Sequence, residues 1–506
     1  MHQRPFPKVA FRWLLFLSAA LLLSPAPGWG MDTFFVGPRA MGMAGANVAS
    51  VNDTSAQYYN PAAFGFFGER SSDNKPLASD NNDLGRKRWG VDLNASGGYR
   101  LQGDFGQYLD DLSQIDYKVL ANTNLASESD LVKLIDLVKD LNGLNQPGNA
   151  ITADANAGLA VRVGHFAVGA RGFAQASGQV VSLDETNLGL PVSGATLNTQ
   201  IGTINVTGND GQVLLFTAQQ QADLTAAGLD SSTIQKLDYL ARQEGVTSSD
   251  VQGVTSLLSI VASGGGGTLD QNTTTVRVEG FGLGEVPLSY GYPINEHWAV
   301  GGNIKLLVGR VYGTELLVFD NNSGDVIKNA DNNYKQSVNF GLDLGVMGRY
   351  KYFNVGLVGR NLNAPSFDGP TVTTTLADGT TRTTTFADVT IDPQVTAGVA
   401  FIPFDTLTIE SDCDLTQNAT TLPGYDTQNL SFGVEWTPFH AVALRAGTYK
   451  NLLKSDIGWV YTAGLGVNLW AARLDVAGAF STKKGQYDGN DVPEETRLSA
   501  QLSVDF

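Results

Sequence analysis

The clearest pattern in the chain is a strict alternation of apolar and polar residues over residues 497–506. Leu498, Leu502 and Phe506 occupy one set of alternate positions, whereas Arg497 and Asp505 belong to the other set. A period of two is typical of a β-strand with one apolar and one polar face. In an outer-membrane barrel the apolar face contacts lipid and the polar face lines the lumen. The aromatic residue at the apolar edge of this last strand favours such a barrel.

About fourteen segments with this alternation follow one another after residue 88, one of them predicted over 352–366. Their connections alternate between very tight turns, such as Gly164-His165, and long loops, such as 367–389. Short turns at one rim and long loops at the other are expected of a barrel threaded from the periplasm, and an even strand number fits as well. We therefore predict an all-β fold, a transmembrane antiparallel β-barrel of about 14 strands over residues 88–506.

Two long insertions interrupt the strands, at about residues 100–148 and 177–271. Apolar residues at helical spacing predict a helix that starts at Ser127 and two more helices at 232–243 and 249–261. Both insertions connect strands on the long-loop side, so we expect them outside the cell. Their apolar faces either offer a landing site for hydrophobic molecules or pack together as a cap.

The face opposite the apolar one carries many charged residues. A soluble core does not tolerate so many charges, whereas a wet or plugged lumen does. We expect most of them to pair with one another, as Glu435 and Arg445 would across their hairpin. Phe340 and Phe432, on the other face, are predicted to contact lipid. The lumen-facing charges are predicted to be Arg162, Arg171, Asp343, Arg349, Arg360, Glu410, Asp412, Glu435, Arg445 and Arg473.

The N-terminal 30 residues are predicted to be a secretory signal peptide. Arg4 and Lys8 supply a positive region, residues 13–23 supply an apolar core, and cleavage is expected near Gly30. The apolar core is too short to span a bilayer as a helix. Export, together with the barrel pattern, predicts a location in the bacterial outer membrane.

Residues 34–66 read FFVGPRAMGMAGANVASVNDTSAQYYNPAAFGF. Small residues permit close approach of backbones, and Pro61 after Asn60 fixes a turn. This segment resembles the N-terminal plug of the long-chain fatty-acid transporter (FadL-like) superfamily, in its Gly/Ala/Met-rich stretch, its Asn-Asp turn and its Asn-Pro-Ala tripeptide. In its layout the chain looks most like the conjugal-transfer TraF-like outer-membrane proteins of that superfamily.

The resemblance implies that residues 31–87 fold inside the barrel as a hatch, with the Asn-Pro-Ala tripeptide near a ligand path. It also implies outer-membrane lipid and a hydrophobic small molecule as partners. Phe506 resembles the terminal signal by which outer-membrane proteins are recognised, which implies the barrel-assembly machinery as a further partner. The residues assigned to the hatch and ligand path on this basis are Met41, Gly42, Met43, Gly45, Asn60, Pro61 and Ala62.

Composition argues against other classes of protein. The chain has 33 Lys+Arg against 50 Asp+Glu, a net charge of -17, and no basic run, so nucleic acid is not an expected partner. Cys413 is the one cysteine, so no intrachain disulfide forms. After the signal peptide, histidine occurs only at His165, His297 and His440, in separate predicted turns. Catalytic and metal sites need converging side chains, so we expect no enzyme, no metal and no cofactor.

Two functions follow from these patterns. The first is an outer-membrane channel that takes up hydrophobic small molecules, such as fatty acids or hydrocarbons, through a plugged barrel. The second is a structural barrel, associated with conjugation or secretion, that binds protein partners through its extracellular loops. The large insertions favour the second function, because a small-molecule channel does not obviously need them. A continuous apolar tunnel past the hatch would favour the first.

Overall fold

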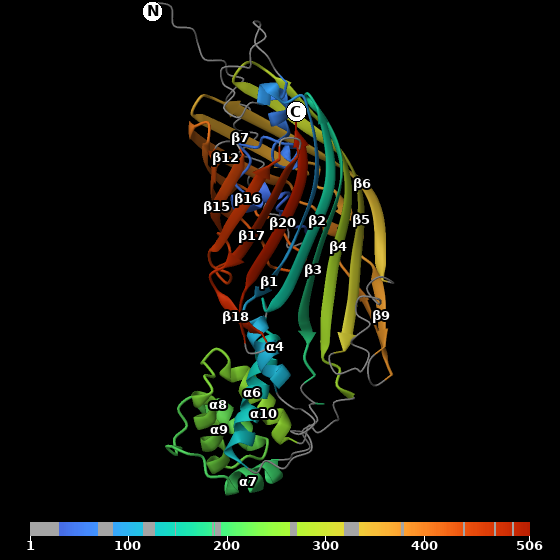
Figure 1. Cartoon of the computed structure of the whole chain (residues 1–506). Coiled ribbons are helices and arrows are strands. Elements are labelled where there is room, and N and C mark those ends of the chain that lie inside the picture. Colours follow the sequence, from blue (N-terminus) through green and yellow to red (C-terminus); the bar gives the residue numbers. More distant parts are fainter. Residues whose placement is uncertain are drawn as a thin grey trace, which may run out of the picture.

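The computed structural model describes most of the chain after the predicted signal peptide (Figure 1). Residues 1–29 of the predicted signal peptide and Phe506 lie outside the described residues, as do His440 and the glycine run 264–267. The described residues are 30–68, 84–114, 127–146, 148–184, 187, 194–263, 271–317, 333–375, 379–438, 441–469, 472–487 and 490–505.

Fourteen antiparallel strands form a closed barrel, which confirms the predicted fold. The C-terminal strand closes it, because β20 pairs with β17 on one side and with β1 on the other, Leu93 lying opposite Leu502. The strands, in barrel order, are β1 (Trp89–Gln102), β2 (Ala150–Val163), β3 (Phe166–Ser182), β4 (Thr275–Pro293), β5 (Trp298–Leu317), β6 (Tyr334–Arg349), β7 (Phe353–Arg360), β12 (Gln394–Phe404), β13 (Leu407–Asp414), β14 (Asn429–Trp436), β15 (Val442–Asn451), β16 (Val460–Asn468), β17 (Arg473–Ser481) and β20 (Glu495–Asp505).

The two rims of the barrel differ as the connection lengths predicted. Tight turns join β2 to β3 and β4 to β5 at one rim, and long connections leave the other rim. Both helical insertions belong to the long-loop rim, and the helices lie beyond that end of the barrel in Figure 1. Among the described residues, no helix is long and apolar enough to cross a membrane.

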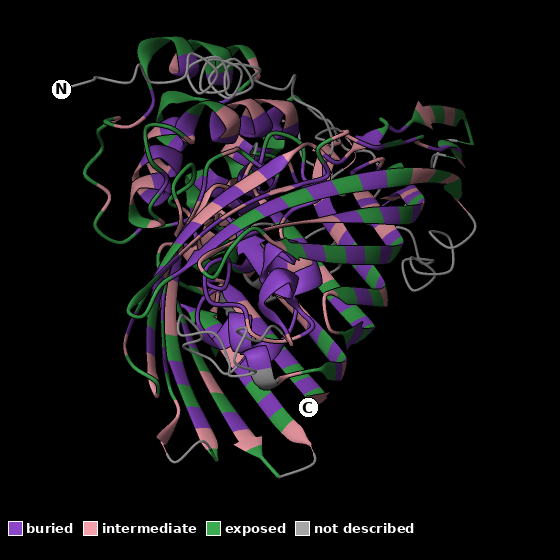
Figure 2. Cartoon of the chain, turned by 90° about the horizontal axis from the view of Figure 1, so that it is seen from above, coloured by how far each residue is buried: buried purple, intermediate pink, exposed green. Residues whose placement is uncertain are grey.

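The strands alternate in exposure, which Figure 2 shows as green and purple bands along each arrow. Phe340 is 54% exposed and Phe432 is 44% exposed, so neither is buried between two sheet layers. Glu435 and Arg445, on the opposite face, are both buried. The outward face is therefore apolar and the inward face is polar, as a lipid-facing barrel requires.

β7 is shorter than the predicted strand over 352–366, because it ends at Arg360. Asn361 and Ala364 then adopt positive φ angles of 52° and 47°, which turn the chain away from the sheet. The backbone N–H of Leu342 on β6 donates to the side-chain oxygen of Asn363 at 2.9 Å, where a regular strand would offer a carbonyl. This part of the wall is completed by side chains.

The connection from β7 to β12 folds back onto the barrel wall, which the sequence did not predict. It holds two small sheets, β8 (Ser366–Phe367) with β11 (Val389–Thr390), and β9 (Thr371–Thr375) with β10 (Thr381–Thr385). Phe367 and Phe386 are buried against β5 because Gly309 and Gly313 leave room for their rings. Arg382 binds Glu315 of β5 at 2.7 Å and fixes the hairpin there. A further hairpin, β18 (Lys484–Tyr487) with β19 (Asn490–Pro493), extends from β17.

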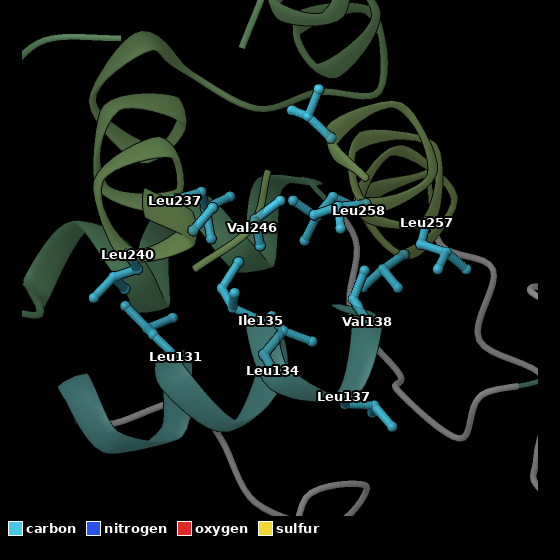
Figure 3. Packing of buried hydrophobic residues seen from close by; sticks show 14 of the residues in the cluster. Leu131, Leu134, Ile135, Leu137, Val138, Leu237, Leu240, Val246, Leu257 and Leu258 are labelled. Atoms are coloured by element: carbon cyan, nitrogen blue, oxygen red, sulfur yellow. The ribbon is translucent and has the colours of Figure 1, made fainter. Parts of the chain in front are cut away.

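The two insertions form a single helical cap with one apolar core, drawn in Figure 3. Leu134 and Val138 of the first insertion share this core with Leu237 and Leu258 of the second. The predicted helix start at Ser127 is formed by a capping box, since its hydroxyl accepts from the N–H of Asp130. The cap helices are α4 (Phe105–Gln114), α6 (Glu128–Leu144), α7 (Gly194–Thr203), α8 (Ala218–Ala226), α9 (Ser231–Gln243) and α10 (Val251–Ala262).

This packing decides between the two alternatives for the insertions. The apolar faces of α6, α9 and α10 are buried against one another and so are not open as a landing surface. Sequence periodicity located these three helices but missed α4, α7 and α8, which have no more than ten residues each.

Candidate functional site

The segment from Gly30 to Phe67 runs through the interior of the barrel. Its N–H at Gly30 donates to the carbonyl of Thr420, in the long loop between β13 and β14, at 3.2 Å. Its far end packs Gly65 against Ala299, beside the tight turn that joins β4 to β5. The segment therefore extends from the long-loop rim to the short-turn rim, and Figure 2 shows its buried helices within the ring of strands. We call residues 30–67 the inner segment.

Short helices shape the inner segment. α2 (Pro38–Gly42) begins with proline at its first position, after Gly37 at a φ of 85°. α3 (Ala56–Tyr59) runs into the 3-10 helix η1 (Pro61–Phe66), and Asn60 caps η1 by accepting from the N–H of Ala62 at 3.1 Å. A second 3-10 helix, η2 (Leu84–Arg86), precedes β1.

Asn60 joins three pieces of backbone inside the barrel. Its side-chain nitrogen donates to the carbonyl of Val48 at 3.1 Å and to the carbonyl of Val346 on β6 at 3.1 Å. The residue is fully buried, so water cannot replace these bonds. Asn60 therefore fixes the inner segment both to itself and to the wall.

Glycines of the wall lie wherever the inner segment touches it most closely. A Cβ atom on Gly345 would lie 2.2 Å from Oδ1 of Asn60, and one on Gly301 would lie 2.3 Å from the carbonyl oxygen of Pro61. A Cβ on Gly433 would lie 2.5 Å from the carbonyl oxygen of Met43. At Gly301 and Gly433 backbone packs directly on backbone, and at Gly345 the side chain of Asn60 lies directly on the wall, which only glycine permits.

The other predicted hatch residues are also buried against this wall. Met41 and Met43 are at most 1% exposed, and Ala62 is fully buried. Gly42 lies over Gly464 of β16, where a Cβ atom on Gly42 would lie 3.1 Å from the Cα of Gly464. Gly45 lies beside the ring of Phe35.

Two carboxylates of β13 hold the middle of the inner segment. Asp412 accepts from the N–H groups of Asn47 and Val48 at 2.8 and 2.9 Å. Glu410 accepts from the N–H of Ala49 at 2.7 Å and from the hydroxyl of Ser50. A turn with four donors pointing at one strand is thus satisfied by two acidic side chains on that strand.

A chain of buried charges continues from these carboxylates. Arg39 of the inner segment binds Glu435 at 3.0 Å, and Glu435 also binds Arg445 at 2.7 Å across the β14–β15 hairpin, the predicted pair. Arg445 then binds Asp475 at 2.7 Å, and Asp475 binds Arg473 at 2.9 Å. The charges on this side of the lumen are paired with one another and with the inner segment.

The opposite side of the lumen has its own pairs. Lys305 binds Asp343 at 2.9 Å, and Arg171 lies 3.6 Å from Glu285. Other cations lie over aromatic rings of the inner segment, at distances to the ring centroid of 3.9 Å for Arg162 on Phe67, 5.3 Å for Arg349 on Phe66 and 4.6 Å for Arg360 on Tyr58. The lumen was predicted to be either wet or plugged, and in the structure it is filled by the inner segment.

A cavity of about 60 Å³ remains between the inner segment and the wall. Five aromatic rings line it, together with three arginines and three aspartates. Its aromatic residues are Phe34, Phe35, Tyr58, Tyr59 and Tyr449. Its charged residues are Arg100, Arg360, Arg497, Asp32, Asp412 and Asp414. We call this the aromatic cavity.

Most groups around the aromatic cavity are held in place by other residues. The hydroxyl of Tyr58 accepts from the N–H of Phe34 at 2.8 Å, and Arg100 binds Glu495 at 3.2 Å. Arg360 lies over the ring of Tyr58 and donates to the carbonyl of the same residue at 3.5 Å. A buried guanidinium beside aromatic rings suits a ligand that is largely apolar and has a polar end.

A second cavity of about 140 Å³ lies nearer the short-turn rim, between the inner segment and strands β1, β17 and β20. Polar residues dominate its lining, among them Arg39, Asp53, Lys87, Arg473 and Asp505. Each cavity holds only a few water molecules, at roughly 30 Å³ each. A ligand larger than that passes the inner segment only if the segment moves.

The two histidines that the structure describes lie apart from each other. His165 and His297 lie in different turns, and Nδ1 of His297 bonds the carbonyl oxygen of Arg349 at 3.0 Å. In the described ranges, no cluster of three or more His, Cys, Asp or Glu side chains could hold a metal ion. Cys413 is half-buried and shares the outward face of β13 with Ile409.

Sequence reasoning missed the partners contributed by the inner segment. Arg39 and Glu435 are 396 residues apart, and no periodic pattern relates them. Arg100 lies just where the first insertion was predicted to begin, and β1 instead continues past it to Gln102. Aromatic residues in a Gly/Ala-rich segment were the one available signal for the cavity at Tyr58 and Tyr59.

Comparisons with known proteins complete the description of the site. The family model described as "F plasmid transfer operon, TraF, protein" matches residues 57–414. No curated protein matches the chain. Similar solved structures include the Pseudomonas putida toluene transporter TodX, with a TM-score of 0.45 and 11% identity over 94% of this chain and 99% of that chain. The Ralstonia pickettii toluene transporter TbuX has a TM-score of 0.40 and 12% identity over 93% and 97% of the two chains. A Pseudomonas aeruginosa FadL homologue has a TM-score of 0.43 and 11% identity over 94% and 99%.

Proposed function

We propose that this chain, which belongs to the family described as "F plasmid transfer operon, TraF, protein", is an outer-membrane channel for hydrophobic small molecules. These molecules are of the fatty-acid or hydrocarbon type. The inner segment acts as its hatch. The ligand enters from the long-loop side, occupies the aromatic cavity and leaves when the hatch shifts.

The aromatic cavity is the observation that carries this proposal. Its five rings offer apolar contact, and its three arginines offer positive charge for a polar end of the ligand. It lies between hatch and wall, so a ligand that enlarges it presses directly on residues of the hatch such as Gly45 and Val48. Binding of the ligand in the aromatic cavity therefore also displaces the hatch.

The contacts of Asn60 determine which movement is needed. Its bond to Val346 must break for the hatch to leave β6, whereas its bond to Val48 lies within the hatch. Pro61 and Ala62 follow, because their backbone lies against Gly301. This supports the assignment of the Asn-Pro-Ala tripeptide to the gate.

Uptake of radiolabelled oleate and toluene tests the proposal in cells that depend on this protein. The double variant Asn60→Ala, Pro61→Ala is expected to change uptake several-fold, because the buried hydrogen bond from Asn60 to Val346, worth ~1 kcal/mol, holds the hatch against β6. Asn205→Ala, an exposed position in the cap, is the matched control and should leave uptake unchanged. Equal uptake by wild type and double variant would remove the gating role.

A filled lumen and a cap with its own core favour the second candidate, a barrel that binds protein partners outside the cell. The same assay separates the two. If cells with and without the wild-type protein take up oleate and toluene equally, the channel function fails and partner binding through the cap becomes the better account.

A further inference from the structure

A wide hollow lies on the outer face of the barrel. It spans strands β12 to β16 and has a volume of about 520 Å³, several times that of either interior cavity. We call it the outer groove. Side chains that line it and project outward include Val399, Phe401, Phe432, Ala446, Thr448 and Tyr461.

The register of the strands explains the shape of the groove. One row crosses five strands in the order Val399, Ser411, Phe432, Thr448 and Tyr461. A second row runs beside it in the order Phe401, Ile409, Val434 and Ala446. The small side chains at Ser411, Ala446 and Thr448 lie among large ones, so the surface is hollow between aromatic ridges.

The hatch supports this part of the wall from inside. Gly433 and Gly447 lie behind the groove, and each packs on backbone atoms of Met43. A Cβ on Gly447 would lie 2.8 Å from the carbonyl carbon of Met43. At these positions the wall is one backbone thick, with the hatch on one side and the groove on the other. The floor of the groove is therefore preformed.

We propose that the outer groove binds one acyl chain of a membrane phospholipid. The groove belongs to the lipid-facing side, where no water is available and an empty hollow loses dispersion contacts. Five adjacent strands span roughly 19 Å, four gaps of ~4.8 Å, which is a length suited to an extended chain.

The volume argues against a protein occupant. An α-helix ~10 Å wide and ~19 Å long fills roughly 1,500 Å³, about three times the volume of the groove. A second copy of the barrel would present side chains of a curved sheet rather than one narrow ridge. A single unbranched hydrocarbon chain fits the hollow without rearrangement of the wall.

Native mass spectrometry of the purified barrel with palmitoyl-oleoyl phosphatidylethanolamine tests this site. Ala446→Phe and Ser411→Leu fill the groove from the lipid face, where large apolar residues are tolerated. Ala170→Phe makes the same change as the first variant at an exposed alanine of β3, away from the groove. Heat-modified mobility on gels checks that every variant is folded.

Wild type and Ala170→Phe are expected to retain one phospholipid per barrel, and both groove variants about tenfold less, the change given by ~1.4 kcal/mol. Glycerophosphoethanolamine, which has the headgroup but no chain, should not bind. Equal retention by folded wild type and both groove variants would overturn the proposal, as would a wild type that retains no lipid. Uptake of oleate is measured separately, so loss of lipid retention and loss of transport are distinguished.

Discussion

Replacing Gly433 with alanine tests whether backbone contact with the wall keeps the hatch closed. The new Cβ would lie 2.5 Å from the carbonyl oxygen, 2.6 Å from Cβ and 2.9 Å from Cα of Met43. None of these atoms can rotate away as the end of a flexible side chain would. The hatch at Met43 must therefore move by several tenths of an ångström.

The size of the effect follows from the cost of overpacking. One additional methyl group in a well-packed interior destabilises it by ~1–3 kcal/mol. This cost applies to the closed state and is relieved when the hatch leaves β14. The population of the displaced hatch should then rise by roughly 5- to 150-fold.

Recording currents through single barrels in a planar bilayer measures this population directly. Barrels with Gly433→Ala should open at least about five times as often as wild-type barrels. Gly172→Ala is the matched control, because a Cβ at this outward position meets no atom within 4 Å. Opening frequencies that are the same in all three proteins would refute the idea that glycine contacts hold the hatch.

Three further changes test the charges and the cap. Glu435→Gln removes the buried anionic partner of Arg39 and should lower the unfolding free energy by ~3–5 kcal/mol, measured by heat-modified mobility. Lys335→Gln is the control, because Lys335 is in an exposed ion pair whose loss should cost at most ~1 kcal/mol. Ser127→Ala removes a capping box and should destabilise the cap by ~1 kcal/mol, seen as faster hydrogen exchange in α6. Burial raises the pKa of Asp140 to about 7, so its protonated carboxyl stabilises the folded cap below about pH 4, and this stabilisation is lost as the pH rises through 7. Proteolysis of the cap should be faster at pH 8 than at pH 5 in wild type, and the difference should be smaller in Asp140→Asn, because burial also raises the pKa of Asp136 and of Glu244 in the cap.

The barrel wall could be predicted from sequence because the residues of each strand alternate between apolar and polar, according to the two faces of the wall. Alternation is local, so residues such as Phe432 and Glu435 are assigned to faces without knowledge of their neighbours. Parity of turn and loop lengths then gives the orientation of each hairpin. The early end of β7 was not predicted, because it depends on positive φ angles at Asn361 and Ala364. Neither residue type reliably indicates such an angle.

The contacts inside the lumen could not be predicted in the same way. The inner segment has no regular period, and its bonds join positions hundreds of residues apart, as between Val48 and Asp412. The sequence placed Glu410 and Asp412 in the lumen but gave no indication that they accept from backbone N–H groups of the hatch. Small residues and the Asn-Pro-Ala tripeptide predicted a segment inside the barrel, whereas its partners required the structure.

One sequence signal for the hatch contacts does exist, and it lies in the wall rather than in the hatch. Gly301, Gly345 and Gly433 occupy positions on strands whose neighbours two residues away, such as Asn303, Asp343 and Glu435, point inward. A glycine on the inward face cannot pair with the charges beside it, and it leaves room for another group next to the wall. That room is taken by backbone of Pro61 at Gly301, by backbone of Met43 at Gly433 and by the side chain of Asn60 at Gly345. At Gly309 it is taken by the ring of Phe367 instead. Inward glycines therefore indicate where other groups approach the wall from the lumen, and the first three lie along the inner segment.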